Sequence, residues 1–146
     1  MILIDKYQRF QKNLQLHHLF PERNDGICAC GCDKPLPNKR RKRWASDECR
    51  RKSYTYLCVI KGDTATIRDL LFQIERGFCR GCGVECGPKE WDADHIIPVH
   101  KGGGACDMDN FQTLCKQCHW DKSADEARQR ARVQNKFAHE NKGYYL

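Results

Sequence analysis

The sequence predicts an α+β fold in which a short strand, a loop, a second strand and a long helix form one unit stapled by four cysteines. Three observations predict this unit. The segment 91–99 is rich in β-branched and aromatic residues and runs into three consecutive glycines at 102–104. Residues 111–114 suit a returning strand, and 124–138 are rich in strong helix formers. One CxxC pair precedes the first strand and another precedes the helix.

The N-terminal segment, residues 1–25, is expected to form an amphipathic helix. Its apolar side chains recur at roughly helical spacing between residues 4 and 20, which predicts a helix that buries one face. Because a proline disfavours helical geometry in the residue before it, the helix should end before Pro21.

Two further helices are expected ahead of the strands. The first is capped by Ser46 or Asp47 and closes the segment 26–62, which also contains a cysteine-rich knuckle and a basic stretch. The second begins the C-terminal domain, residues 63–146, and ends at Gly77. It should bury a stripe formed by Ile67, Leu70, Leu71 and Ile74.

The cysteines indicate metal binding. There are 11 of them, and an odd number cannot all pair as disulfides within one chain. CxxC pairs in a reducing compartment usually hold zinc, and four thiolates close a tetrahedral site that leaves no position for water. We therefore expect one structural zinc ion, held by Cys79, Cys82, Cys115 and Cys118.

A second cysteine cluster precedes the basic stretch and allows a second structural zinc ion. Its candidate ligands are Cys28, Cys30, Cys32 and Cys49. A site with three of these ligands, or no site at all, stays open as an alternative.

The charge pattern indicates a polyanionic partner. The formal net charge is +7, and it is concentrated in the basic runs 39–43 and 50–52. No apolar stretch is long enough to span a bilayer, and the first residues lack the pattern of a signal peptide. We expect an intracellular protein, cytoplasmic or nuclear, without a membrane partner.

Three polar features coincide in the C-terminal domain. Asp94 and His95 end the first predicted strand, Asn110 follows His95 by fifteen residues, and His119 opens the last predicted helix. Through DHIIPVHKGGG and DNFQTLCKQCH, the chain resembles the HNH endonuclease family, which has a ββα-metal fold. It resembles even more closely the HNH module at the C-terminus of the zinc-finger, Ran-binding annealing helicases, including GGGACDMDNFQTLC and the stretch from CDKPLP to SDECRR. Those relatives show CxxC and then CxxxC in the first knuckle, whereas Ala45 replaces one of those cysteines here.

The resemblance and the chemistry of phosphodiester hydrolysis suggest the same roles. Neutral His95 can take a proton from water near neutral pH, so we expect it to be the general base. Asp94 points to the other side of the strand and, with His119, should hold a hard catalytic ion such as Mg²⁺ or Mn²⁺. Asn110 should support the loop, as the family's middle asparagine usually does, although some members take a ligand from that region. Asp92 shares the face of Asp94, and we interpret it as an ordinary strand residue.

The predicted activity is a metal-dependent HNH endonuclease that hydrolyses DNA. The expected partner is DNA, branched or single-stranded DNA included, with RNA not excluded and a helicase or repair protein as a further candidate partner. Residues expected to meet phosphates are Lys101, Lys122, Arg128, Arg40, Arg41 and Arg43. The alternative is a noncatalytic zinc-dependent module that binds nucleic acid or recruits a helicase.

Overall fold

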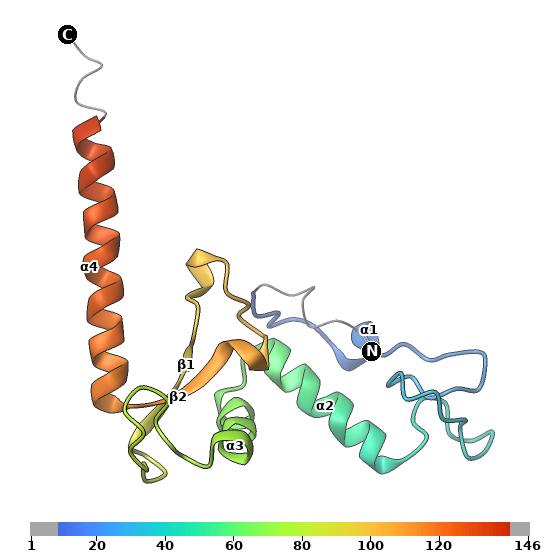
Figure 1. Cartoon of the computed structure of the whole chain (residues 1–146). Helices are drawn as coiled ribbons and strands as arrows, with labels where there is room; N and C mark the ends of the chain where they lie inside the picture. The colour runs from blue at the N-terminus through green and yellow to red at the C-terminus, as the bar shows by residue number, and fades with distance from the viewer. Residues whose placement is uncertain (1–8, 141–146) are drawn as a thin grey trace.

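The computed structural model describes residues 9–140, which form helices around a two-stranded sheet. The elements in chain order are α1 (Leu16–Leu19), α2 (Asp47–Lys61), α3 (Thr64–Glu75), β1 (Trp91–His95), the 3-10 turn η2 (Val99–Lys101), the 3-10 turn η3 (Met108–Asn110), β2 (Phe111–Cys115) and α4 (Lys116–Glu140). In Figure 1, α2 runs from the cysteine-rich N-terminal part to the sheet, and α4 extends away from the sheet. The α+β class and the strand, loop, strand and helix order are confirmed.

The two strands are antiparallel, and α3 packs against both of them. Trp91 pairs with Cys115 at one end of the sheet, and His95 pairs with Phe111 at the other. Arg68 of α3 lies over the Trp91 ring, 3.8 Å from its centroid, and donates a 2.6 Å hydrogen bond to the Trp91 carbonyl. The main core consists of Val59, Ile67, Leu71, Cys79, Cys86, Trp91, Phe111 and Leu114.

The ends of α2 and α3 confirm the helices expected from the sequence. The Ser46 hydroxyl accepts a hydrogen bond from the Cys49 N–H, and the Asp63 carboxylate accepts one from the Thr66 N–H. Gly62 ends α2 with φ 75°, in the left-handed conformation that glycine adopts without strain. Both helices therefore begin at local signals, and α2 also ends at one, whereas α3 ends at Glu75 with Arg76 in the left-handed conformation.

The prediction that Ile74 belongs to the buried stripe of α3 is wrong. Ile67 and Leu71 are buried, but Ile74 is 69% exposed. In this last turn of α3 it is Glu75 that faces the sheet, because its carboxylate accepts a 2.6 Å hydrogen bond from the Thr113 N–H. Ile74 is left outside that contact.

The expected N-terminal helix is wrong over residues 9–15, and its part before residue 9 lies outside the described residues. In the described part of 4–20, only Leu16–Leu19 is helical. The Gln11 N–H donates to the Ile60 carbonyl at 2.8 Å, so the backbone bonds to the end of α2 instead of to itself. A second core cluster receives the apolar side chains here, and it contains Leu19, Phe20, Leu57, Ile60, Ala105 and Cys106.

The last helix begins earlier than expected, three residues before His119. Cys115 ends β2, and its sulfur accepts a hydrogen bond from the Cys118 N–H at 3.4 Å, so the thiol satisfies a donor of the first turn. His119 consequently lies within the first turns of α4. Among residues 9–140, no helix is both long enough and apolar enough to cross a membrane.

Candidate functional site

Asp94 and His119 face each other between β1 and α4. The distance from Asp94 Oδ1 to His119 Nε2 is 3.8 Å. Two ligands of one octahedral ion, each ~2.1 Å from it, lie between ~3.0 and ~4.2 Å apart, so this pair fits a hard divalent ion. The other oxygen of Asp94, Oδ2, accepts a 3.0 Å hydrogen bond from Gln112 Nε2. The carboxylate is therefore held with Oδ1 toward the histidine.

Asp92 orients the histidine from the same face of β1. Its Oδ2 is 3.0 Å from His119 Nδ1, and its Oδ1 accepts a 2.6 Å hydrogen bond from Lys116 Nζ. Because a carboxylate oxygen accepts, Nδ1 carries the proton in the neutral ring, and the lone pair of Nε2 faces Asp94. Hydrogen bonds from Lys116 and His119 lower the pKa of Asp92, although its burial acts the other way and is the largest single effect.

Lys122 lies inside this cluster rather than on an open surface. Its Nζ is 2.9 Å from Asp94 Oδ2, 2.6 Å from Glu126 Oε1 and 2.9 Å from the His95 carbonyl oxygen. Burial, the largest effect, lowers the pKa of Lys122, but its bonds to Glu126 and Asp94 outweigh burial and raise it overall. The lysine therefore stays charged and fixes Asp94 as well as the end of β1.

His95 points to the side of β1 opposite Asp94, as the period of two requires. Its ring lies 4.4 Å from the Phe111 ring and 6.3 Å from the Phe10 ring, measured between centroids. Its Nε2 is 3.2 Å from the Ala105 carbonyl oxygen. Because a carbonyl only accepts, Nε2 carries the proton in the neutral ring, and the lone pair is on Nδ1. This tautomer can accept a proton at Nδ1.

Asn110 is buried and joins both sides of the loop that follows β1. Its Nδ2 donates to the carbonyls of Ile97 and Gly104, both at 3.0 Å, and its Oδ1 accepts from the Ile97 N–H at 2.9 Å. The Ile96 N–H also donates to the Asn110 backbone carbonyl at 2.7 Å. The structure thus places Asn110 where the sequence analysis expected it, as a clamp on the loop that carries on from His95.

Gly103 is the position at which this clamp tolerates no side chain. A Cβ there would lie 1.9 Å from the Ile97 carbonyl oxygen and 2.7 Å from Asn110 Nδ2. We expect Gly103→Ala to displace the loop and to lower the free energy of unfolding by about 1–3 kcal/mol. Thermal unfolding measures this change.

Gly87→Ala is the matched control for Gly103→Ala. The three atoms nearest to a Cβ at Gly87 all belong to the movable side chain of Glu90, the closest at 3.0 Å. Equal melting temperatures for the two alanine variants would contradict the clamp.

The four cysteines around the sheet form one cluster. The sulfur atoms of Cys79, Cys82, Cys115 and Cys118 all lie within 4.8 Å of one another. A regular zinc tetrahedron with bonds of about 2.3 Å has sulfur–sulfur edges of about 3.8 Å, and Cys82 Sγ is 3.8 Å from Cys115 Sγ. Burial raises the pKa of Cys79, but backbone donors led by Cys115 outweigh it and lower that pKa to about 6. The cluster could bind zinc, and Cys86 lies outside it.

The second cysteine cluster, which precedes the basic stretch, also comes together in the structure. Cys28, Cys30, Cys32 and Cys49 have sulfur atoms within 4.8 Å of one another, so the set with four ligands fits better than a smaller one. A hydrogen bond from Ser46 is the largest cause that lowers the pKa of Cys49 to about 7. This cluster could hold a second zinc ion and joins the knuckle to the first turn of α2.

The other basic residues expected at the nucleic acid are divided between two places. Lys101 donates to Gln129 of α4 at 2.7 Å, and Arg128 pairs with Asp125. Arg41 pairs with Asp47 at 3.1 Å, and Arg43 pairs with Glu22 at 3.6 Å. Arg40 is exposed in the basic stretch. The structure joins Lys101 to α4 through Gln129, leaves Arg128 exposed on that helix, and places the arginines of residues 40–43 in the N-terminal knuckle.

Known proteins share sequence with the part of the chain that carries this site. The family model described as HNH endonuclease matches residues 79–125. A protein named "Probable HNH endonuclease" from Lactococcus phage SK1 is 32% identical over 73 residues, which cover 47% of this chain and 77% of the phage protein. No solved structure matches the chain.

Longer relatives also match. The protein named "DNA annealing helicase and endonuclease ZRANB3" is 27% identical over 140 residues in Mus musculus, which cover 68% of this chain and 13% of the mouse protein. Its Homo sapiens counterpart is 51% identical over 43 residues, which cover 30% of this chain and 4% of the human protein. The chain therefore corresponds to only a small part of these relatives.

Proposed function

The chain belongs to the HNH endonuclease family, and on that premise we propose that it hydrolyses phosphodiester bonds in DNA with one divalent ion. The observation that carries the proposal is the pairing of Asp94 Oδ1 with His119 Nε2 at 3.8 Å, together with His95 on the opposite side of β1, whose Nε2 lies against the Ala105 carbonyl and leaves Nδ1 as the base. A nucleic-acid substrate follows from the family. The longer relatives are named as a DNA annealing helicase and endonuclease, which supports DNA as that substrate.

In this mechanism His95 acts on the attacking water. Nδ1 takes a proton from the water as its oxygen bonds to phosphorus, the bond from phosphorus to the 3′ oxygen breaks, and the departing 3′ oxygen takes up a proton from solvent water. The products are a 5′ phosphate and a 3′ hydroxyl. The Ala105 carbonyl keeps Nε2 protonated, and Phe111 packs on the ring, so the base stays in one tautomer and one orientation.

Asp94 and His119 would hold the ion at the opposite side of β1. A bound divalent ion would neutralise the negative charge that grows on the phosphate and on the departing oxygen. Lys122 holds Oδ2 of Asp94, which leaves Oδ1 as the ligand atom, and Asp92 holds Nδ1 of His119, which leaves Nε2. The scissile phosphate has to lie at the end of β1, where side chains from both faces can reach it.

Plasmid cleavage tests the proposal. The zinc-loaded protein is incubated with supercoiled plasmid and with branched or single-stranded DNA, in the presence of Mg²⁺, Mn²⁺ or neither ion. Cleavage that requires one of the added ions is expected. Absence of cleavage on every substrate, together with DNA binding, would favour the noncatalytic module instead.

Asp92→Asn should weaken the binding of the working ion. Asparagine offers one acceptor where Asp92 serves both His119 and Lys116, so His119 loses its fixed tautomer. Loss of such a supporting carboxylate typically costs 10–100-fold in metal affinity. We expect the Mn²⁺ concentration for half-maximal cleavage to rise about tenfold, with the maximal rate largely recovered at high Mn²⁺.

Asp121→Asn is the matched control for Asp92→Asn, because Asp121 lies on α4 and bonds to Gln117 at 3.0 Å. An unchanged Mn²⁺ requirement in Asp92→Asn would show that Asp92 is the ordinary strand residue that the sequence suggested.

A further inference from the structure

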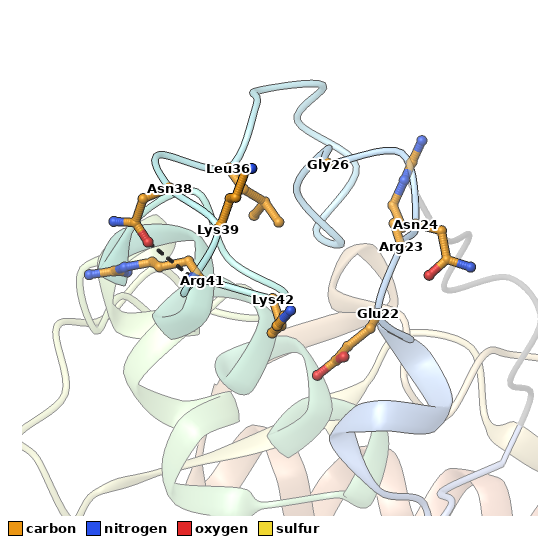
Figure 2. Close-up of a pocket in the computed structure, with 9 residues that line it drawn as sticks. All are labelled: Glu22, Arg23, Asn24, Gly26, Leu36, Asn38, Lys39, Arg41 and Lys42. Atoms are coloured by element: carbon orange, nitrogen blue, oxygen red, sulfur yellow. Dashed lines mark hydrogen bonds between the residues drawn. The ribbon is translucent and has the colours of Figure 1, made fainter.

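A cavity of about 630 Å³ lies in the N-terminal knuckle, apart from the site between β1 and α4. Figure 2 shows its two walls: Arg23 and Asn24 lie on one, and the loop with Asn38 and Lys39 lies on the other. The Leu36 N–H donates to the Gly26 carbonyl at 2.8 Å and ties the walls together. The cavity is thus formed by the fold itself.

Four cations line the cavity, and two of them lack a counter-ion. Arg23 bonds to both oxygens of Asp25, and Arg41 pairs with Asp47. Within residues 9–140, Lys39 and Lys42 form no ion pair. Two unpaired ammonium groups in one hollow repel each other, and an anion between them would remove that repulsion.

The remaining polar groups favour an anion as well. Among the described residues of the lining, the single carboxylate is that of Glu22, which is 3.6 Å from Arg43; this arginine lies outside the cavity and offsets its charge. Asn38 Oδ1 accepts the backbone N–H groups of Arg40 and Arg41 at 3.0 and 3.1 Å. Its acceptor is thereby used within the loop, and its amide group remains as a donor.

The lining suits recognition of a nucleic-acid backbone rather than of the bases. None of the described residues around the cavity is aromatic, so it offers no ring on which a base could stack. Ammonium, guanidinium and amide donors are the groups that contact phosphate oxygens without reading sequence. The chemistry of the lining therefore suits a sugar–phosphate backbone.

We propose that this cavity holds the phosphate backbone of the DNA that the chain cuts, as a second contact away from the site of cleavage; this rests on the proposed function. In Figure 1, α2 lies between the knuckle and the sheet. A helix of 15 residues is about 22 Å long at 1.5 Å per residue, which corresponds to about six base pairs of duplex at 3.4 Å each. The cavity would thus bind the duplex outside the cleaved step.

The test compares two double variants that each remove two positive charges. Lys39→Gln with Lys42→Gln changes the unpaired cations of the cavity. Arg130→Gln with Arg132→Gln changes two exposed arginines outside its lining. The affinity of the full, zinc-loaded chain for a fluorescent duplex of about 30 base pairs is measured without Mg²⁺ over a range of salt concentrations.

The lysine variant is expected to bind about tenfold more weakly, with the slope of log K against log salt reduced by about 2, because two phosphate contacts are lost. The arginine variant should lose less than about threefold. Equal losses in both variants would overturn the cavity as a binding site, since only diffuse charge would then matter. Because binding is read without cleavage, a protein that binds in this way but never cuts would contradict the nuclease proposal and leave the cavity standing.

Discussion

His95→Ala is expected to reduce the rate of DNA cleavage about a thousandfold in a protein that stays folded. The removed group is the proposed proton acceptor, whereas Asp94, His119 and Lys122 keep their mutual contacts on the other side of β1. Ion binding should therefore survive the substitution, and the loss should fall on the maximal rate. Single-turnover cleavage at saturating Mg²⁺ measures it.

His100→Ala is the control for His95→Ala, because His100 is exposed on the neighbouring turn Val99–Lys101. Thermal unfolding and zinc content establish that both variants are folded. A folded His95→Ala protein that cuts as fast as His100→Ala would rule out His95 as the base, and an unfolded one would mean that His95 is chiefly a packing residue against Phe111.

Cys115→Ser is expected to remove one zinc ion and to unfold the region around the sheet. Cys115 ends β2, caps the first turn of α4 through the Cys118 N–H, and lies 3.8 Å from Cys82 Sγ. Zinc bound by a structural site is worth about 10–16 kcal/mol at neutral pH in small zinc domains, which is as much as the whole stability of a typical domain. The unaltered chain should contain about two zinc ions, and Cys115→Ser about one.

Cys58→Ser is the matched control for Cys115→Ser, since Cys58 belongs to neither cluster and is only half-buried. It should retain both zinc ions and unfold in one transition near that of the unaltered protein. Elemental analysis counts the zinc, and circular dichroism follows unfolding. A well-folded, active Cys115→Ser protein would contradict the structural role of this cluster.

The helices α2 and α3 could be predicted because their signals are local. Ser46 and Asp63 cap the first turns, Gly62 takes a left-handed conformation, and the apolar residues between them keep a helical period. The cysteine clusters could be predicted for a related reason, because CxxC spacing already brings two ligands together. The second cluster was less certain, since three cysteines at alternate positions meet Cys49 only through the fold.

The non-helical conformation of residues 9–15 could not be predicted in this way. Helical spacing of apolar residues is also satisfied when a non-helical segment packs its side chains on a neighbour, and the Gln11 N–H bonds to the Ile60 carbonyl, far along the sequence. Ile74 continues the stripe of α3 by spacing alone, but Glu75 occupies the contact with the sheet. Both differences come from tertiary contacts that leave no local pattern.

The candidate site likewise combines residues that the sequence identifies with residues that only the folded contacts identify. Asp94, His95, Asn110 and His119 stand out by spacing, whereas the roles of Asp92 and Lys122 depend on contacts between β1 and α4. A usable signal existed for Asp92, because the period of two places it on the face of Asp94. For Lys122, the spacing of three residues from His119 places both side chains on one face of the last helix.

Because Cys118 lies directly before His119, zinc binding at the cysteines and divalent-ion binding at the proposed site would be thermodynamically coupled. These residues belong to the first turns of α4, so an ion at the cysteines that orders this turn also orders the histidine. Linkage is reciprocal, and whatever factor zinc contributes to the affinity for Mg²⁺ must be returned by Mg²⁺ to the affinity for zinc. At equilibrium, a chelator would therefore remove zinc less readily from the Mg²⁺-bound chain, by that same factor.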